Sequence, residues 1–195
     1  MPKKLIAITG GIGSGKSLVL ETLEKAGHHT LSSDKIVKDL YKKPKIKRIL
    51  KDLFPNAVKG ETRLRIDYKT LSELAFKDKE NNEGLTKAIT PLVLEQILRK
   101  TKSKDGLVFV EVPLLFECGF ADHFDNAIVV LRDKNERIES VKTRSNLTKE
   151  QVEKRMAFQV DYDKIDLSKY LVVINDKNTE DLKNKVLRLV SDLNK

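Results

Sequence analysis

The stretch Gly10-Gly11-Ile12-Gly13-Ser14-Gly15-Lys16-Ser17 decides the fold of this chain. It matches the pattern Gly-x-x-x-x-Gly-Lys-Ser/Thr, in which glycines let successive backbone N–H groups point at phosphate oxygens. Lys16 is predicted to bring a positive charge to the β and γ phosphates of ATP, and Ser17 to offer its hydroxyl to Mg²⁺. An apolar run, Leu5 to Thr9, precedes the loop, and a helix is expected from Lys16 to about Ala26. Strand, loop and helix in this order are the context that the motif requires.

Short apolar runs recur along the chain and are continuous rather than alternating, which is typical of strands buried on both faces of a parallel sheet. The runs are Leu5 to Thr9, Leu107 to Val112, Ala127 to Leu131 and Leu171 to Ile174, with His29 to Ser32 as a weaker fifth. Helical patterns separate them. The sequence therefore predicts an α/β fold of the P-loop NTPase type, with a parallel five-stranded sheet flanked by helices.

The helical patterns carry recognisable ends and faces. Asp133 with Glu136, and Thr148 with Gln151, have the spacing of capping boxes at helix N-termini. Residues 182 to 193 carry the apolar stripe of an amphipathic helix. Residues 36 to 102 show helical patterning without a convincing strand. We expect a single domain with a core of residues 1–35, 103–139 and 166–195, a helical substrate-binding region at about 36–102 and a lid at about 140–165.

Composition narrows the class of protein. The 195 residues are 39% apolar and 34% charged, which suits a globular domain with a well-solvated surface. The net charge of +9 suits anionic partners, or simply a lysine-rich surface, but the lysines are scattered and no aromatic residues interleave with them, so nucleic acid is not expected as a partner. Cys118 is the single cysteine, and no apolar run approaches the roughly 20 residues of a membrane span. We expect a cytoplasmic protein without a membrane partner, and a monomer is favoured.

Asp34 closes the weak second strand. Because the carboxyl ends of parallel strands open onto one crevice, its carboxylate is a candidate to orient an acceptor hydroxyl and accept its proton. On spacing alone, an N-cap for the following helix explains Asp34 as well as catalysis does.

Several motifs together resemble the dephospho-coenzyme A kinase family, and the resemblance runs nearly end to end. They are Thr9 to Ser17, then Asp34, then V-P-L-L-F-E at Val112 to Glu117, and the segment Arg144 to Gln159. The resemblance implies transfer of the γ-phosphoryl group of ATP to the ribose 3′-hydroxyl of dephospho-coenzyme A, the final step of coenzyme A synthesis. Magnesium is the implied metal.

The resemblance also implies roles for single residues. Asp34 is the candidate base, and Lys16 and Arg144 are the cations that neutralise charge on the transferring group. Glu111 is implied to hold magnesium through water, beside the Ser17 hydroxyl. Arg155 and Gln159, four residues apart on one helix face, match a lid pair, although a solvated helix face also explains them. The implied nucleotide-binding residues are Gly11, Gly13, Ser14, Gly15, Lys16, Ser17, Leu18, Arg144, Arg155 and Gln159.

The chain departs from the family pattern at four positions. Leu18 replaces a threonine, Tyr68 an arginine, Thr90 a histidine, and Ser140 an arginine that the lid helix often carries. These changes concern acceptor recognition and the lid more than the chemistry. They leave open another small-molecule kinase, acting on a nucleoside monophosphate, and a regulatory nucleotide-binding module is the rival from another class. A surface loop explains Glu117 and Cys118, which receive no role.

Overall fold

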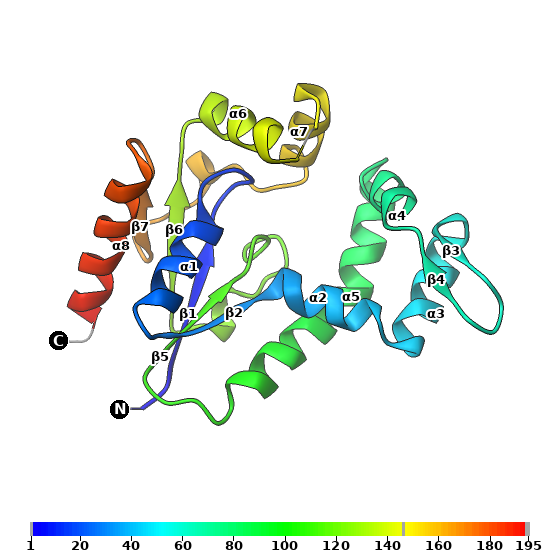
Figure 1. Ribbon diagram of the computed structural model, residues 1–195, viewed down its shortest axis with the longest axis horizontal. Helices are drawn as coiled ribbons and strands as arrows, with labels where there is room; N and C mark the ends of the chain where they lie inside the picture. Colours follow the sequence, from blue (N-terminus) through cyan, green and yellow to red (C-terminus); the bar gives the residue numbers. More distant parts are fainter. Residues whose placement is uncertain (1, 146, 194–195) are drawn as a thin grey trace. The chain divides into compact units, whose positions relative to one another are not determined.

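The structure, a computed structural model, describes residues 2–145 and 147–193. The chain forms two compact units (Figure 1). Unit 1 holds the chain up to Ser32 and from Thr101 onward, and unit 2 is the continuous segment Ser33–Lys100.

Unit 1 is built on a five-stranded parallel sheet in the order β2-β5-β1-β6-β7. The strands are β1 (Lys4–Thr9), β2 (His29–Ser32), β5 (Leu107–Glu111), β6 (Asn126–Leu131) and β7 (Leu171–Ile174). All five coincide with the apolar runs of the sequence, so the predicted parallel sheet is confirmed. β1 lies in the centre, and its residues from Leu5 to Thr9 are all buried, because neighbours cover both its edges and both its faces.

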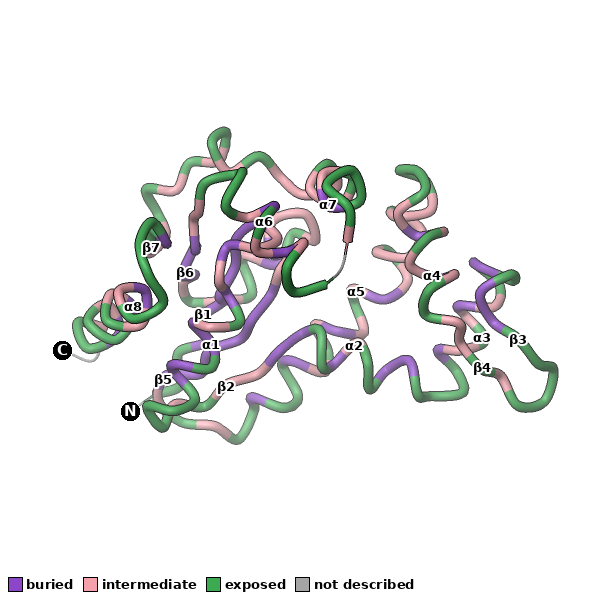
Figure 2. The backbone as a smooth tube through the Cα atoms, turned by 45° about the horizontal axis from the view of Figure 1, so that its top comes forward, coloured by how far each residue is buried: buried purple, intermediate pink, exposed green. Residues whose placement is uncertain are grey.

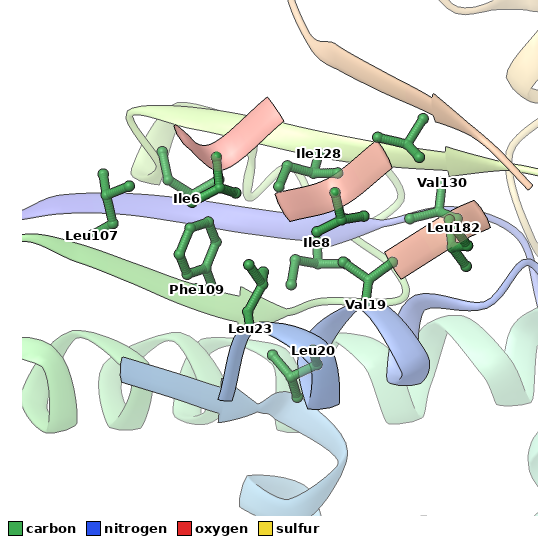
Figure 3. Close-up of a cluster of buried hydrophobic side chains, with 13 residues drawn as sticks. Ile6, Ile8, Val19, Leu20, Leu23, Leu107, Phe109, Ile128, Val130 and Leu182 are labelled. Atoms are coloured by element: carbon green, nitrogen blue, oxygen red, sulfur yellow. The ribbon is translucent and has the colours of Figure 1, made fainter. Parts of the chain in front are cut away.

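The main apolar core of unit 1 lies between one face of this sheet and two helices, α1 (Lys16–Lys25) and α8 (Thr179–Leu193) (Figure 3). The apolar stripes of both helices face the strands, and their outer faces are exposed (Figure 2). Buried residues from strands and helices interdigitate there, and they include Ile6, Ile8, Val19, Leu23, Phe109, Ile128, Leu182 and Val186. The packing fixes the end of β1 and the start of α1, between which the glycine loop runs.

Two further helices of unit 1 are α6 (Lys134–Ser145) and α7 (Lys149–Met156). Thr148 and Gln151 form the predicted capping box at the start of α7, with both reciprocal hydrogen bonds present. At the start of α6, Asp133 accepts from the N–H of Glu136, but the Glu136 carboxylate pairs with Arg132 instead of completing the box. Two single 3-10 turns, Ala121–His123 and Tyr162–Lys164, complete the unit.

Unit 2 is mainly helical, as its sequence indicates. Its elements are α2 (Ser33–Tyr41), α3 (Pro44–Leu53), a 3-10 turn (Pro55–Ala57), β3 (Val58–Lys59), β4 (Arg65–Ile66), α4 (Tyr68–Ala75) and α5 (Lys79–Thr101). The expectation that this segment contains no strand is wrong, because β3 and β4 pair as an antiparallel hairpin. Strands of two residues are too short to show a hydrophobic period. No helix in the described ranges is long and apolar enough to cross a bilayer.

Candidate active site

The glycine loop connects the end of β1 to the start of α1 and is closely enclosed. Gly10, Gly13 and Gly15 have φ values of 141°, 80° and 109°, which side chains rarely adopt. A Cβ at Gly10 would collide with the carbonyl oxygen of Val130, and one at Gly13 would lie 2.5 Å from the carbonyl oxygen of Arg137. The loop therefore requires glycine for its conformation and for the close approach of neighbouring backbone.

Lys16 lies in the first turn of α1 with its ammonium folded back over the loop. Its Nζ donates to the carbonyl oxygens of Gly10 and Gly11, at 2.7 and 2.9 Å, and the residue is only 7% exposed. Gly15, the N-cap of α1, provides no side-chain cap, so the positive end of the helix dipole faces the loop. A buried ammonium beside an uncapped helix N-terminus is an arrangement that binds phosphate.

The two predicted magnesium ligands lie together. Ser17 Oγ donates to Glu111 Oε1 at 2.9 Å, and Glu111 is 6% exposed at the end of β5. Register places Glu111 beside Ile8 of β1, so neighbouring strand ends bring the hydroxyl and the carboxylate together. Both are hard oxygen donors of the kind that Mg²⁺ prefers, and Mg²⁺ commonly takes one or two protein ligands together with nucleotide phosphates. The pair therefore fits a magnesium site completed by ATP.

The expectation that Arg155 and Gln159 share one helix face is wrong, because α7 ends at Met156 and Gln159 follows it, bound to the loop. Its Oε1 accepts a hydrogen bond of 2.7 Å from the N–H of Ile12, which is a loop residue. The Ile12 side chain packs on the apolar cluster that α6 and α7 share, formed by Ile138, Val141 and Val152. The phosphate loop is thus joined to α6 and α7 by an apolar contact and to the segment that follows α7 by a hydrogen bond.

The remaining residues expected near the nucleotide are more dispersed. Arg144 is exposed in the last turn of α6, where it lines an open groove of about 610 Å³ together with Ser140 and Thr143. Arg155 is half-buried in the last turn of α7. The side chain of Leu18 is apolar, unlike the threonine of the family, and it packs on the main core. Roles toward ATP stay predictions for all three.

Asp34 lies in the first turn of α2, which starts as soon as β2 ends at Ser32. It belongs to unit 2, whereas the loop belongs to unit 1. Its role as the base stays a prediction.

Sequence reasoning missed a group of polar residues behind the loop. The assignment of Glu117 to a surface loop is wrong, because its Oε1 accepts from the N–H of Val160 at 2.9 Å and its Oε2 is buried without a hydrogen-bond partner among the described residues. Burial raises the pKa of Glu117, and the charge of Lys16 partly opposes this. Cys118, beside it, is half-buried. The segment 159–162 is therefore fixed to both the glycine loop and the V-P-L-L-F-E segment.

Tyr162 and Asn175 belong to the same supporting group. The hydroxyl of Tyr162 lies 3.2 Å from Thr9 Oγ1, and burial raises the pKa of the phenol to about 12, so it stays neutral. Asn175 Nδ2 donates to the carbonyl oxygen of Ser14 at 2.9 Å, and the residue is buried. Neither residue lies in a motif, so nothing in one sequence marks them.

A loop of this kind, at the end of the central strand of a parallel sheet, places the chain in the P-loop class of nucleoside triphosphate-binding proteins. A family model described as dephospho-CoA kinase matches residues 4–181, and the chain belongs to that family. The resemblance drawn from the sequence is thereby confirmed, and the protein is a kinase.

Individual relatives agree with this assignment. A dephospho-CoA kinase of Fusobacterium nucleatum is 33% identical over 185 residues, covering 94% of this chain and 95% of the relative. A crystal structure of a Thermus thermophilus protein matches with a TM-score of 0.82 and 31% identity, over 99% of each chain. The solved dephospho-CoA kinase of Campylobacter jejuni has a TM-score of 0.65 and 26% identity, over 98% of this chain and 97% of its own.

Proposed function

We propose that this chain transfers the γ-phosphoryl group of ATP to the ribose 3′-hydroxyl of dephospho-coenzyme A, yielding coenzyme A and ADP. The observation that carries the proposal is the phosphate loop, in which Lys16 is buried over the carbonyls of Gly10 and Gly11 and Ser17 is bonded to Glu111. The family match supplies the acceptor. Cytoplasmic location and a monomeric state complete the proposal.

Lys16 is proposed to leave the two loop carbonyls for the β and γ phosphates when ATP binds. Exchange of two neutral carbonyl acceptors for anionic phosphate oxygens adds the attraction between opposite charges to its hydrogen bonds. Ser17 and Glu111 would hold magnesium, which would supply positive charge to the oxygens of the transferring group. The backbone N–H groups of the loop hold the remaining phosphate oxygens.

Asp34 is proposed as the base that takes the proton of the acceptor hydroxyl. It follows Ser32 by two residues, and Ser32 is the register partner of Glu111, so the chain itself keeps Asp34 near the end of the sheet at which the loop lies. Arg144 is proposed as the cation that neutralises charge on the transferring phosphoryl group, with Arg155 and Gln159 as further lid residues. Unit 2 is proposed to carry the acceptor site, where Tyr68 and Thr90 alter the family pattern.

The first test measures ADP release with Mg²⁺ and ATP, with and without dephospho-coenzyme A, and identifies the product by mass. Strong stimulation by the acceptor and a product heavier by one phosphoryl group support the proposal. Asp34→Asn is expected to keep ATP binding while transfer falls by about 10²- to 10⁴-fold, the usual contribution of a general base. Transfer at the wild-type rate by this variant would show that Asp34 is not the base.

An acceptor panel separates the remaining alternatives. Stimulation by a nucleoside monophosphate instead of dephospho-coenzyme A would indicate another small-molecule kinase of this fold. Slow hydrolysis that no acceptor stimulates would indicate a regulatory nucleotide-binding module.

A further inference from the structure

Arg137, in the first turn of α6, touches the phosphate loop with both its backbone and its side chain. Its carbonyl oxygen approaches Gly13 so closely that a Cβ there would lie only 2.5 Å away. The position that a Cβ would take on Gly11 is occupied by Nη1 of the Arg137 guanidinium. The loop thus has a second cation beside Lys16, one that belongs to neither the glycine motif nor the V-P-L-L-F-E motif.

The guanidinium of Arg137 has unused hydrogen-bonding capacity. Its Nε is buried and has no hydrogen-bond partner among the described residues. Arg137 forms no ion pair with any residue that the structure describes, whereas eleven ion pairs join other residues there. The carboxylates nearest in sequence, Glu136 and Glu139, pair with Arg132 and Lys142, and Asp133, one helical turn earlier, caps α6 by accepting from the N–H groups of Asn135 and Glu136. A buried donor on a permanent cation is costly unless an anion joins it.

Arg137 also lies close to a position of α6 at which the chain departs from the family pattern. Ser140 stands where the lid helix of the family often carries an arginine. Arg137 precedes Ser140 by three residues, which is close to one helical turn on the same face. Arg144 follows Arg137 by seven residues and therefore continues the same stripe. α6 presents one arginine beside the loop and another two turns away.

We propose that Arg137 binds an oxygen of the polyphosphate chain of the nucleotide and takes the place of the arginine missing at position 140. The inference rests on one part of the proposed function, namely that ATP binds at the loop. The guanidinium donates a charge-assisted hydrogen bond to phosphate, and the apolar contact of Ile12 with α6 and α7 holds the helix against the loop.

Calorimetric titration without any acceptor tests this role. The ligands are a non-hydrolysable ATP analogue, inorganic tripolyphosphate and adenosine, and the variants are Arg137→Met, Arg137→Lys and Lys142→Met. Arg137→Met is expected to weaken tripolyphosphate and analogue binding about 10- to 100-fold, the effect of one charge-assisted hydrogen bond, and to leave adenosine binding unchanged. Arg137→Lys is expected to retain part of the affinity. Lys142→Met removes the same charge from another face of α6, where Lys142 pairs with Glu139, and should bind as wild type does.

Thermal unfolding separates ligand binding from mere support of the loop. Methionine replaces a half-buried guanidinium, whose Nε is buried without a hydrogen-bond partner among the described residues, with an apolar side chain of similar length, so Arg137→Met is expected to unfold at the wild-type temperature or above it. Unchanged affinity for tripolyphosphate in Arg137→Met would overturn the inference and leave the proposed function standing. A wild-type chain that binds no ATP analogue would overturn both.

Discussion

Replacement of Gly13 by alanine tests how closely the phosphate loop is joined to α6. The new Cβ would meet two obstacles, a φ of +80° and the carbonyl oxygen of Arg137 at 2.5 Å. Left-handed backbone costs a non-glycine residue about 1–2 kcal/mol. Relief of the clash requires α6 or the loop to move by several tenths of an ångström, and overpacking of this kind costs about 1–3 kcal/mol more.

Gly27→Ala is the matched control. Gly27 has a φ of +89°, and a Cβ there has nothing within 4 Å, so this variant carries the backbone cost alone. The entropy that alanine removes from the unfolded chain is the same in both variants and cancels. Gly13→Ala is therefore expected to be less stable than Gly27→Ala by about 1–3 kcal/mol, which corresponds to roughly 2–12 °C in Tm for a chain of this size.

Urea unfolding and calorimetric binding of an ATP analogue measure the two consequences. We expect Gly13→Ala to bind the analogue weakly because the loop and Arg137 separate, whereas Gly27→Ala binds as wild type does. Equal losses of stability in the two variants, or intact binding of the analogue by Gly13→Ala, would refute the claim that contact with α6 excludes a side chain at position 13.

Three further outcomes follow from the contacts described. Glu111→Gln is expected to reduce the Mg²⁺-dependent gain in ATP affinity by about 10-fold or more and to leave metal-free binding unchanged, whereas Glu139→Gln on the surface of α6 should behave as wild type. Phe109→Ala, at a fully buried position, is expected to cost about 3–5 kcal/mol in urea unfolding, whereas Leu187→Ala, at a position 39% exposed, should cost far less. Because the pKa of Glu117 is raised in the folded state, its titration makes the folded chain less stable as pH rises from the ordinary value of 4.5 through the native pKa. Glu117→Gln is therefore expected to gain stability relative to wild type between about pH 4 and pH 8.

Each of these has a clear contrary result. Equal Mg²⁺ dependence in Glu111→Gln and Glu139→Gln would remove Glu111 from the metal site. Similar losses in Phe109→Ala and Leu187→Ala would contradict the placement of the core. A constant difference between Glu117→Gln and wild type across the pH series would mean that the carboxyl titrates alike in the folded and unfolded chains.

The sheet could be predicted from the sequence because its three central strands, β1, β5 and β6, are buried on both faces and so appear as continuous apolar runs. The weak candidate His29 to Ser32 is an edge strand, and its mixed burial explains why its signal is faint. The glycine motif likewise predicted that Lys16 and Ser17 lie at the phosphate loop, since the backbone geometry of such a loop is determined by its glycines. These features depend on local patterns, which one sequence contains in full.

The supporting residues could not be predicted, because they depend on tertiary contacts. Tyr162 meets Thr9 across 153 positions of the chain, and Asn175 meets Ser14 across 161. Arg137 is an intermediate case. Its spacing from Ser140 is visible in the sequence, but only the structure shows its guanidinium against Gly11.

The central place of β1 in the sheet has a consequence for the synthesis of the chain. Both neighbours of β1 come late, since Ile8 pairs with Glu111 of β5 and Ile128 of β6. At a translation rate of about 5–20 residues per second, β5 leaves the ribosome roughly 5 to 20 seconds after β1. Throughout this interval an apolar strand has neither of its partners, and closing so long a loop slows folding. The strand on which the nucleotide site is built is thus an apolar segment that the nascent chain has to keep from aggregating until β5 and β6 are made.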